Sequence, residues 1–318
     1  MTDPQWTVGP DGQGLRLDKF LAAADRLGSR AHAAAALGRG KVFVNGTDAG
    51  IADAGTLLAT GDIVRVWMDR PGSAKRRQPK GGIPDVRIIY EDDALVILNK
   101  PAGLLAVPLP RLSGAPSVLE QLEDHFRSRG WRRPLVVHRI DRDTSGLVVF
   151  AKYAGAQERL KEQFKRREPE RVYLAIVHGV PRPSEGTWRD HLAWDRTALI
   201  QKEARPRDPL GKEAVSDYRV VETFRGASLV EVRLVSGKRN QIRIQACLRG
   251  HSLVGEQRYV NRREQLRPIA FSRQALHAHR LVFRHPVDGR LLSFEAPFPD
   301  DLVELLRRLR RLTNARHR

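Results

Sequence analysis

The sequence has little cysteine, no long apolar run and fewer acidic than basic residues. Cys247 is the single cysteine among 318 residues, which excludes a disulfide within the chain and is typical of a reducing compartment. No apolar run approaches the roughly 20 residues that a membrane-spanning helix needs. Residues 1–14 are polar and do not form the charged start and apolar stretch of a secretory signal. We therefore expect a cytoplasmic protein.

The spacings of several classes of site are also absent. The chain has neither C-x-x-C nor H-E-x-x-H, so a zinc site built from Cys247 and scattered histidines is a weak alternative. A kinase is equally weakly supported, because there is no Gly-rich phosphate loop and no Asp-Phe-Gly, and Ile140 stands where the kinase catalytic loop has aspartate. We expect neither a metal nor a cofactor.

The charge of the chain is strongly positive. Lys and Arg together number 56 against 37 acidic residues, which gives a formal net charge of +19. Such an excess indicates a polyanionic partner. Nucleic acid is the first candidate. An anionic membrane surface is the second, but neither an apolar span nor a lipidation motif supports it.

The densest polar stretch, residues 138–146, directly precedes the apolar residues 147–151. The apolar run has the length of a buried strand, and Gly146 permits a sharp turn at its start. A tight turn whose charges pair with each other would explain such a loop. However, charges packed this densely beside a core strand need partners, and Arg139 and Arg142 supply only part of the compensation that two neighbouring aspartates require. The loop is therefore a candidate functional site.

This stretch resembles the motif His-Arg-Leu-Asp-Arg-x-Thr-Ser-Gly of the RluA family of pseudouridine synthases, with Ile140 as the departure. Asn-Lys-Pro-Ala-Gly at 99–103 and Gln-Ile-Arg at 241–243 are similar to two further motifs of the family. The resemblance covers nearly the whole chain.

The resemblance implies a function and a fold. The function is isomerisation of specific uridines in structured RNA, ribosomal RNA first and transfer RNA second, by a monomer without cofactor. The fold is α+β, with a central, largely antiparallel sheet and a cleft. Asp141 is then the catalytic aspartate, Arg243 its partner, and Tyr173 the tyrosine that lies against the target base. Taken alone, Tyr173 is most simply a core tyrosine.

Basic residues in and near the motifs are the expected contacts to RNA. In the catalytic part they are Lys100, His138, Arg139, Arg142, Lys238 and Arg239. The chain departs from the family at Val107-Pro108, where His-Pro is usual, at Lys238, where Arg is usual, at Asn240 and Gln245, where His is usual, and at Glu256-Gln257, where Gly-Asp is usual. These departures bear on RNA specificity more than on chemistry.

Arg243 also stands out by its neighbours. If Arg239 opens a helix that ends at Gly250, then Arg239, Arg243 and Cys247 share one face. A solvated face is the simpler explanation for two arginines, but the apolar residues between them leave little of the helix exposed. A largely buried arginine needs an anion.

The N-terminal part reads as a separate module. Two short helices and a small sheet are expected between Leu17 and Trp67, and the order of their motifs resembles the S-four-type RNA-binding domain. Its expected RNA-binding residues are Arg16, Lys19, Arg30, Arg39 and Lys41, although solvated helix faces would explain any one of them. We expect this domain at 1–69, a basic flexible linker at 70–84 and the catalytic domain at 85–318.

The main alternative is an RNA-binding protein on the same fold without catalysis. The presence of Asp141, Tyr173 and Arg243 argues against it.

Overall fold

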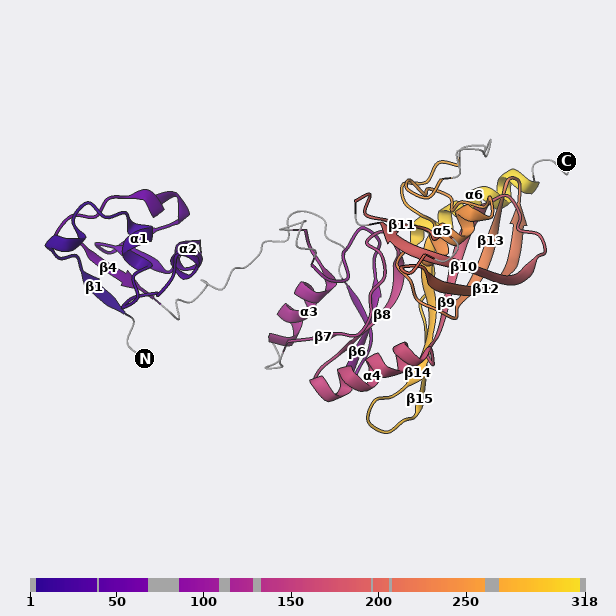
Figure 1. The fold of residues 1–318 in the computed structure, drawn as a ribbon, viewed down its shortest axis with the longest axis horizontal. Coiled ribbons are helices and arrows are strands. Elements are labelled where there is room, and N and C mark those ends of the chain that lie inside the picture. The colour runs from indigo at the N-terminus through magenta and orange to yellow at the C-terminus, as the bar shows by residue number, and fades with distance from the viewer. Residues whose placement is uncertain are drawn as a thin grey trace. The chain divides into compact units, whose positions relative to one another are not determined.

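The computed structural model describes residues 4–38, 40–67, 86–108, 115–127, 133–195, 197–205, 208–260 and 269–314. The chain divides into two compact units, Met1–Gly82 and Ile83–Arg318 (Figure 1). The linker expected at 70–84 lies outside the described residues.

The N-terminal unit is a small sheet with helices packed on it. The sheet has the order β1-β4-β2-β3. Its elements are β1 (Gln5–Thr7), η1 (Pro10–Gly12), α1 (Leu17–Leu21), α2 (Arg30–Gly38), β2 (Val42–Val44), β3 (Thr47–Ala49), η2 (Ile51–Gly55) and β4 (Ile63–Val66). Asn45 and Gly46 both have positive φ and form the tight turn between β2 and β3 that their sequence predicts. The helices bury Leu17, Phe20 and Leu37 against the sheet.

The second unit is built on an eleven-stranded sheet. The main path runs β11-β10-β12-β13-β9-β14-β8-β6-β5, with β15 paired to β14 and β7 to β8. The strands are β5 (Arg87–Glu91), β6 (Leu95–Lys100), β7 (Leu135–Val136), β8 (Ser145–Ala151), β9 (Glu170–His178), β10 (Glu185–Asp195), β11 (Ile200–Glu203), β12 (Lys212–Phe224), β13 (Ala227–Leu234), β14 (Leu276–Arg284) and β15 (Leu291–Glu295). In the described part, only the named pair β14 and β8 runs parallel. The expectation of a largely antiparallel sheet in an α+β fold is confirmed.

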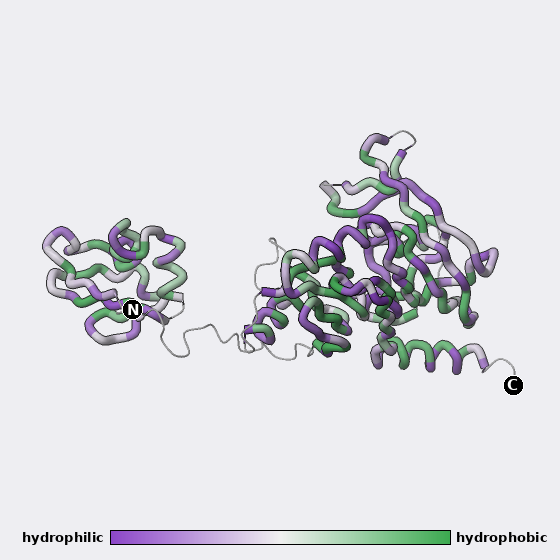
Figure 2. Tube along the Cα trace, turned by 90° about the horizontal axis from the view of Figure 1, so that it is seen from below, coloured by the Kyte–Doolittle hydropathy of each residue, from purple (hydrophilic) through white to green (hydrophobic). Residues whose placement is uncertain are grey.

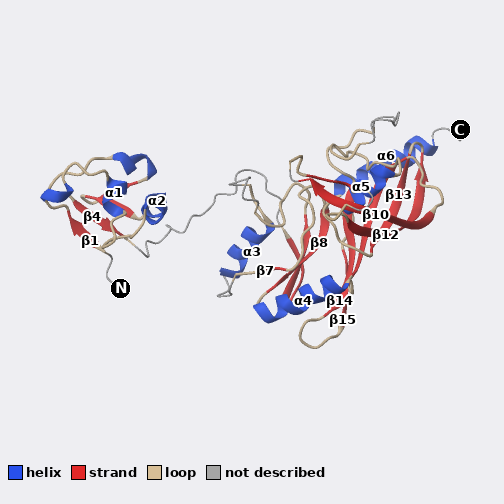
Figure 3. Cartoon of the chain, viewed as in Figure 1, coloured by secondary structure: helices blue, strands red, loops and turns tan. Residues whose placement is uncertain are grey.

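Within the described residues, four helices of the second unit pack against this sheet, and Figure 3 shows them beside its strands. They are α3 (Val118–Arg127), α4 (Ala154–Arg166), α5 (Gln241–Leu248) and α6 (Asp300–Asn314). Side chains of α3 and α5 belong to one buried cluster, whereas those of α4 and α6 belong to two others. Hydrophobic and hydrophilic residues alternate along α6, as expected for a helix with one buried face (Figure 2).

The strands connect these clusters by simple alternation, because successive side chains of a strand point to opposite faces. In β8, Val148 and Phe150 join the cluster of α3 and α5, while Leu147 and Val149 face α4. In β9, Tyr173 points to the side of α5, and the next residue, Leu174, packs with α6. Tyr173 and the start of β8 are thereby brought to the same side of the sheet.

One row across three strands sets the distance between the motif loop and Tyr173. Ala278 of β14 pairs with Gly146 of β8 on one side and with Tyr173 of β9 on the other. Gly146 has φ +113°, and a Cβ there would lie 2.2 Å from the carbonyl oxygen of Ala278. Glycine is required at this position both for its backbone conformation and for the approach of β14.

We predict that Gly146→Ala destabilises the protein by several kcal/mol, because the methyl group would collide with backbone that cannot move independently of the sheet. Gly289→Ala is the matched control. Gly289 also has positive φ, +72°, but nothing lies within 4 Å of its added Cβ, so about 1 kcal/mol should be lost there. Denaturant unfolding of both variants would measure the difference. Equal losses would show that the contact with Ala278 is unimportant.

Candidate active site

Asp141 lies in the loop that leads into β8, and its side chain is 27% exposed. Its Oδ2 oxygen accepts two hydrogen bonds from the start of α5. Arg243 Nη1 donates at 3.0 Å and Asn240 Nδ2 at 2.6 Å. Residues about 100 positions apart in the sequence therefore meet at a single carboxylate oxygen, and the expected pairing of Arg243 with Asp141 is present in the structure.

Arg243 is held from its other side by Glu256. Its Nε and Nη2 each donate to one Glu256 oxygen at 2.7 Å, which is the bidentate geometry of a strong ion pair. The Glu256 side chain has no exposed surface. Its Oε1 also accepts from the backbone N–H groups of Gln257, Arg258 and Tyr259. The buried carboxylate is therefore fully compensated.

Arg243 and Glu256 each stabilise the charged form of the other. Burial alone would lower the pKa of Arg243, but Glu256 and Asp141 raise it above its ordinary value. Burial alone would likewise raise the pKa of Glu256, but Arg243 and the backbone N–H groups lower it below its ordinary value. Arg243 thus presents a fixed positive charge to Asp141 at any pH at which the protein is folded.

The helix that carries these donors starts later than expected. Asn240 has φ +53° and ψ +24°, a left-handed conformation, and α5 begins at Gln241. Arg239 therefore lies outside the helix and does not share a face with Arg243, contrary to the sequence-based expectation. Its guanidinium instead lies 4.0 Å from the ring centre of Trp194. A left-handed residue cannot continue an α-helix, which explains the late start.

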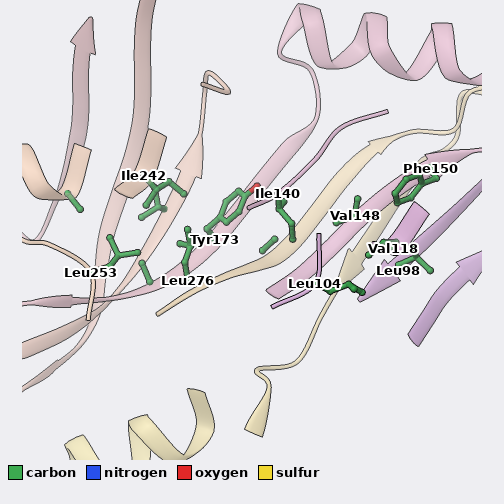
Figure 4. Packing of buried hydrophobic residues seen from close by; sticks show 14 of the residues in the cluster. Leu98, Leu104, Val118, Ile140, Val148, Phe150, Tyr173, Ile242, Leu253 and Leu276 are labelled. Carbon is green, nitrogen blue, oxygen red and sulfur yellow. The ribbon is translucent and has the colours of Figure 1, made fainter. Parts of the chain in front are cut away.

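Tyr173 is 9% exposed and sits in the largest buried cluster. Figure 4 shows its ring between Ile242, Leu253 and Leu276 on one side and Ile140 on the other, with the hydroxyl toward Ile140. Burial raises the pKa of Tyr173, Arg171 opposes that rise, and Asp141 adds to it. Tyr173 therefore carries a neutral phenol within electrostatic range of Asp141.

The Gly-acid pair of the family falls one residue earlier than expected, at Gly255-Glu256 instead of Glu256-Gln257. Gly255 has φ +76°, and a Cβ there would lie 1.9 Å from the carbonyl oxygen of Arg273. Glycine is thus needed at 255, and the acid follows at 256. The chain therefore has a Gly-acid pair with Glu256 in place of Asp, and the Glu256 carboxylate holds Arg243.

Lys100 does not face RNA as expected. Its side chain is completely buried, and Nζ donates at 2.8 Å to the carbonyl oxygens of Pro101, Leu104 and Arg142. Burial lowers the pKa of Lys100 to about 7. Three carbonyl partners match the three hydrogens of an ammonium group. This lysine fastens the loop after β6 to the motif loop.

His138 is the second correction among the expected RNA contacts. Its ring stacks on Phe164 at 4.7 Å between ring centres, and Nε2 accepts a hydrogen bond from the Val149 N–H. Burial and the nearby Arg171 lower the pKa of His138 to about 3. The ring is neutral at physiological pH and offers no charge to a phosphate.

The other basic residues expected to contact RNA in the catalytic unit keep exposed surface. Arg142 pairs with Asp143 at 3.1 Å. Arg139, Lys238 and Arg239 have no carboxylate partner within the described residues. Partial burial and the nearby Arg239 lower the pKa of Arg139, and Asp141 opposes that change. The side chains of Arg139, Arg239 and Asp141 therefore lie near one another.

Arg171 was missed from the sequence. It lies two residues before Tyr173 on β9, and its Nη1 would be 2.6 Å from a Cβ on Gly237. Its Nε is buried without a hydrogen-bond partner, and within the described residues it forms no ion pair. Burial lowers the pKa of Arg171. A single arginine in a strand gives no sequence pattern that would have revealed it.

The N-terminal unit presents some of its expected basic residues. Lys19 and Arg30 are exposed, and Lys41 is partly buried. Arg16 is exposed and pairs with Asp18 at 3.0 Å. Arg39 lies outside the described residues.

Within the described ranges, no three His, Cys, Asp or Glu side chains lie close enough to hold a metal ion, and no helix is long and apolar enough to cross a membrane. An open hollow of about 500 Å³ lies beside β10 and β11, lined by residues that include Arg189, His191 and Arg205. None of the expected site residues lines it.

Comparison with known proteins establishes the family. Residues 94–247 match the family model described as RNA pseudouridylate synthase. The RNA pseudouridine synthase YlyB of Bacillus subtilis is 35% identical over 96% of this chain and 97% of its own length. Ribosomal large subunit pseudouridine synthase D of Zymomonas mobilis is 35% identical over 97% and 98%. The chain therefore belongs to the RluA-type family of RNA pseudouridine synthases, isomerases whose substrate is RNA.

Solved structures agree on the fold. Human RNA Pseudouridylate Synthase Domain Containing 4 aligns with a TM-score of 0.57 and 23% identity over 70% of this chain and 92% of its own. Human RNA Pseudouridylate Synthase Domain Containing 1 gives 0.56 and 21% over 72% and 96%. These likenesses concern the arrangement of the sheet and helices.

The burial of His277 predicts that the protein loses stability in acid. Burial lowers the pKa of His277, which bonds Ser145 Oγ and the Ala296 carbonyl, to about 4 from an ordinary 6.5. The unfolded chain therefore binds this proton more readily. The stabilising effect is complete above pH 6.5 and is lost as pH falls toward 4, by at most about 3 kcal/mol at about 1.4 kcal/mol per pKa unit.

We expect His277→Asn to show a shallower loss of stability between pH 6.5 and 4 than the wild type, although it is less stable at pH 7. His191→Asn, at an exposed position of β10, is the control and should keep the wild-type slope. Denaturant midpoints measured at several pH values would test this. An unchanged slope in His277→Asn would contradict it.

Proposed function

We propose that Asp141 is the catalytic carboxylate and that ribosomal RNA is the substrate. The observation that carries the proposal is the geometry of Asp141: a carboxylate with one oxygen held by Arg243 and its side chain still partly exposed. The choice of RNA is supported by relatives named ribosomal large subunit pseudouridine synthase D. Transfer RNA is the second candidate substrate.

The chemistry needs a carboxylate and little else. The bond from N1 of uracil to C1′ of ribose breaks, the base turns, and C5 bonds to C1′; C5 then gives up its proton and N1 gains one, so the product is an isomer. Asp141 would act as nucleophile or as base at this centre. Arg243 would hold it in place. Tyr173 would offer the base an aromatic surface once the nucleotide has left its stack.

The basic residues around Asp141 would bind phosphates. Arg139, Lys238 and Arg239 lack carboxylate partners in the described part, and so does the partly buried Arg171. A guanidinium that is removed from water needs an anion, and the substrate backbone supplies one at every nucleotide. Arg142 would contribute less, because it is already paired with Asp143.

The N-terminal unit would add a second RNA contact. Its order of helices and strands supports the S-four-type assignment to residues 1–69, with Lys19, Arg30 and Lys41 toward RNA. The expectations of a monomer and of a cytoplasmic location also stay predictions. Light scattering of the purified chain and imaging of a tagged chain would check them.

We predict that RNA affinity falls steeply with salt. A protein that makes about six phosphate contacts loses about a thousandfold in affinity between roughly 50 and 200 mM salt. Arg239→Ala and Arg171→Ala should each reduce the slope of log affinity against log salt by about one. Arg127→Ala is the control, because this exposed arginine is paired with Asp124. A flat dependence in the wild type would mean that the charge serves another purpose.

We predict that Asp141→Asn abolishes uridine isomerisation while RNA binding survives, since the change removes the charge but keeps the size of the side chain. Arg243→Ala should cost about 3–5 kcal/mol of stability, because Glu256 would stay buried without its cation. Pseudouridine formation, RNA binding and unfolding would be measured for each variant.

Asp143→Asn is the matched control two residues away. Within the described residues its side chain pairs with Arg142 alone, and Arg273 holds its backbone carbonyl, which the substitution leaves intact. It should retain most activity. If Asp141→Asn turns over normally, or Asp143→Asn is the inactive one, the catalytic carboxylate has been misassigned.

A further inference from the structure

The structure assigns a role to Asn240 that the family resemblance does not supply. We propose that Asn240 is a positioning residue that, together with Arg243, fixes the Oδ2 oxygen of Asp141 and leaves Oδ1 as the oxygen that acts on the substrate. Tyr259 in turn sets the orientation of the Asn240 amide. The proposal rests on the catalytic role of Asp141 proposed above.

The first observation is that both donors choose the same oxygen. Asn240 Nδ2 lies 2.6 Å and Arg243 Nη1 3.0 Å from Asp141 Oδ2. Within the described residues, no donor to Asp141 Oδ1 is found. Two hydrogen bonds from different directions prevent rotation of the carboxylate about its χ2 torsion. One oxygen is therefore fixed, and the other is free on a side chain that keeps 27% of its surface.

The orientation of the Asn240 amide is itself determined. The Gln201 N–H donates to the Tyr259 hydroxyl oxygen at 2.9 Å, and the Tyr259 O–H donates to Asn240 Oδ1 at 3.2 Å. An ionised carboxylate can only accept, so the amide NH₂ must face Asp141. A flipped amide would place its oxygen against Oδ2. Tyr259 therefore acts on Asp141 through Asn240.

The backbone supports the same reading. Asn240 holds a left-handed conformation directly before α5, which asparagine tolerates better than most residues. From there its side chain and that of Arg243, three residues on, lie on one side of the helix start. Glu256, which holds Arg243, and Tyr259, which holds Asn240, lie three residues apart in one loop, and the Tyr259 N–H donates to Glu256 Oε1. A single loop thus anchors both donors.

The chemistry of the amide is the distinctive part. An amide donates a hydrogen bond without titrating, and burial raises the pKa of Tyr259 further above its ordinary value of 10. Neither Asn240 nor Tyr259 therefore changes charge near neutral pH. The isosteric Asn240→Asp would replace the donor by a second carboxylate 2.6 Å from Asp141 Oδ2. Two carboxylates at that distance do not both ionise freely, so the pair would retain a proton at higher pH.

Asn240→Asp therefore tests the proposal by its pH profile. The acid limb of kcat, measured at saturating RNA, should move upward by about one pH unit or more, with activity recovering as pH is raised. Asn240→Ala should lower kcat by about tenfold to a hundredfold at every pH, with KM for RNA changed less than about threefold, since misplacement of a reacting group acts on the chemical step. Tyr259→Phe should lower kcat by a smaller factor.

Tyr218→Phe is the matched control. Its hydroxyl is buried and donates to the Pro183 carbonyl at 2.8 Å, with no link to Asp141, so kcat and its pH profile should stay at wild-type values. A purely structural role for Asn240 predicts lower thermal stability with an unshifted acid limb in Asn240→Asp. That result, or kcat within threefold of wild type in Asn240→Ala, would overturn the proposal.

The Asp141→Asn variant separates this inference from the proposed function. If Asp141→Asn is active, the catalytic assignment fails and Asn240 has no reacting group to position. If Asp141→Asn is inactive but Asn240→Asp keeps the wild-type acid limb, the catalytic assignment stands and the role of Asn240 is wrong. The carboxyl pKa values measured by ¹³C NMR in the wild type and in Asn240→Asp give a readout without turnover, and the same upward shift is expected.

Discussion

Arg243 places one guanidinium between two carboxylates, and the rest of the site depends on how that charge is compensated. Taking an ion pair out of water costs several kcal/mol unless every remaining donor and acceptor is satisfied. Glu256 meets this condition with a bidentate pair and three backbone N–H groups. Glu256 already neutralises most of the positive charge of Arg243. The contact of Arg243 with Asp141 can therefore orient the Asp141 carboxylate without neutralising it. Two anions share one cation, and Asp141 is the one of the two that keeps exposed surface.

The sequence predicted the sheet and the pairing of Asp141 with Arg243, but not how the pair is held. Alternating and continuous apolar runs identify strands such as β8 because their periodicity is local. The pairing came from a resemblance to a family motif. The contacts of Glu256 with Arg243 and of Tyr259 with Asn240 were not predicted, because they join residues 13 and 19 positions apart and no local pattern records such contacts. The helix start at Gln241 was missed because a left-handed Asn240 depends on tertiary contacts rather than on propensity.

Much of the polar character of residues 138–146 serves to hold the loop itself. Lys100 Nζ binds the carbonyl of Arg142, and Arg273 Nη1 binds that of Asp143. Ser145 bonds His277, which reaches the Ala296 carbonyl. These buried polar groups of the loop each have a protein partner, as low-polarity surroundings demand. This is why Lys100, which a count of basic residues assigns to RNA, belongs instead to the framework of the loop.

These contacts divide residues 138–146 into those that hold the loop and those that remain candidates for function. The residues whose side chains keep both exposed surface and charge are Arg139, Asp141, Arg142 and Asp143, and the last two pair with each other. Arg139 and Asp141 remain, and both side chains keep exposed surface. The catalytic role proposed for Asp141 would require it to keep its position while a large, flexible RNA binds and leaves. The framework contacts meet that requirement, because they fix the backbone directly after Asp141, while no donor to Asp141 Oδ1 is found within the described residues.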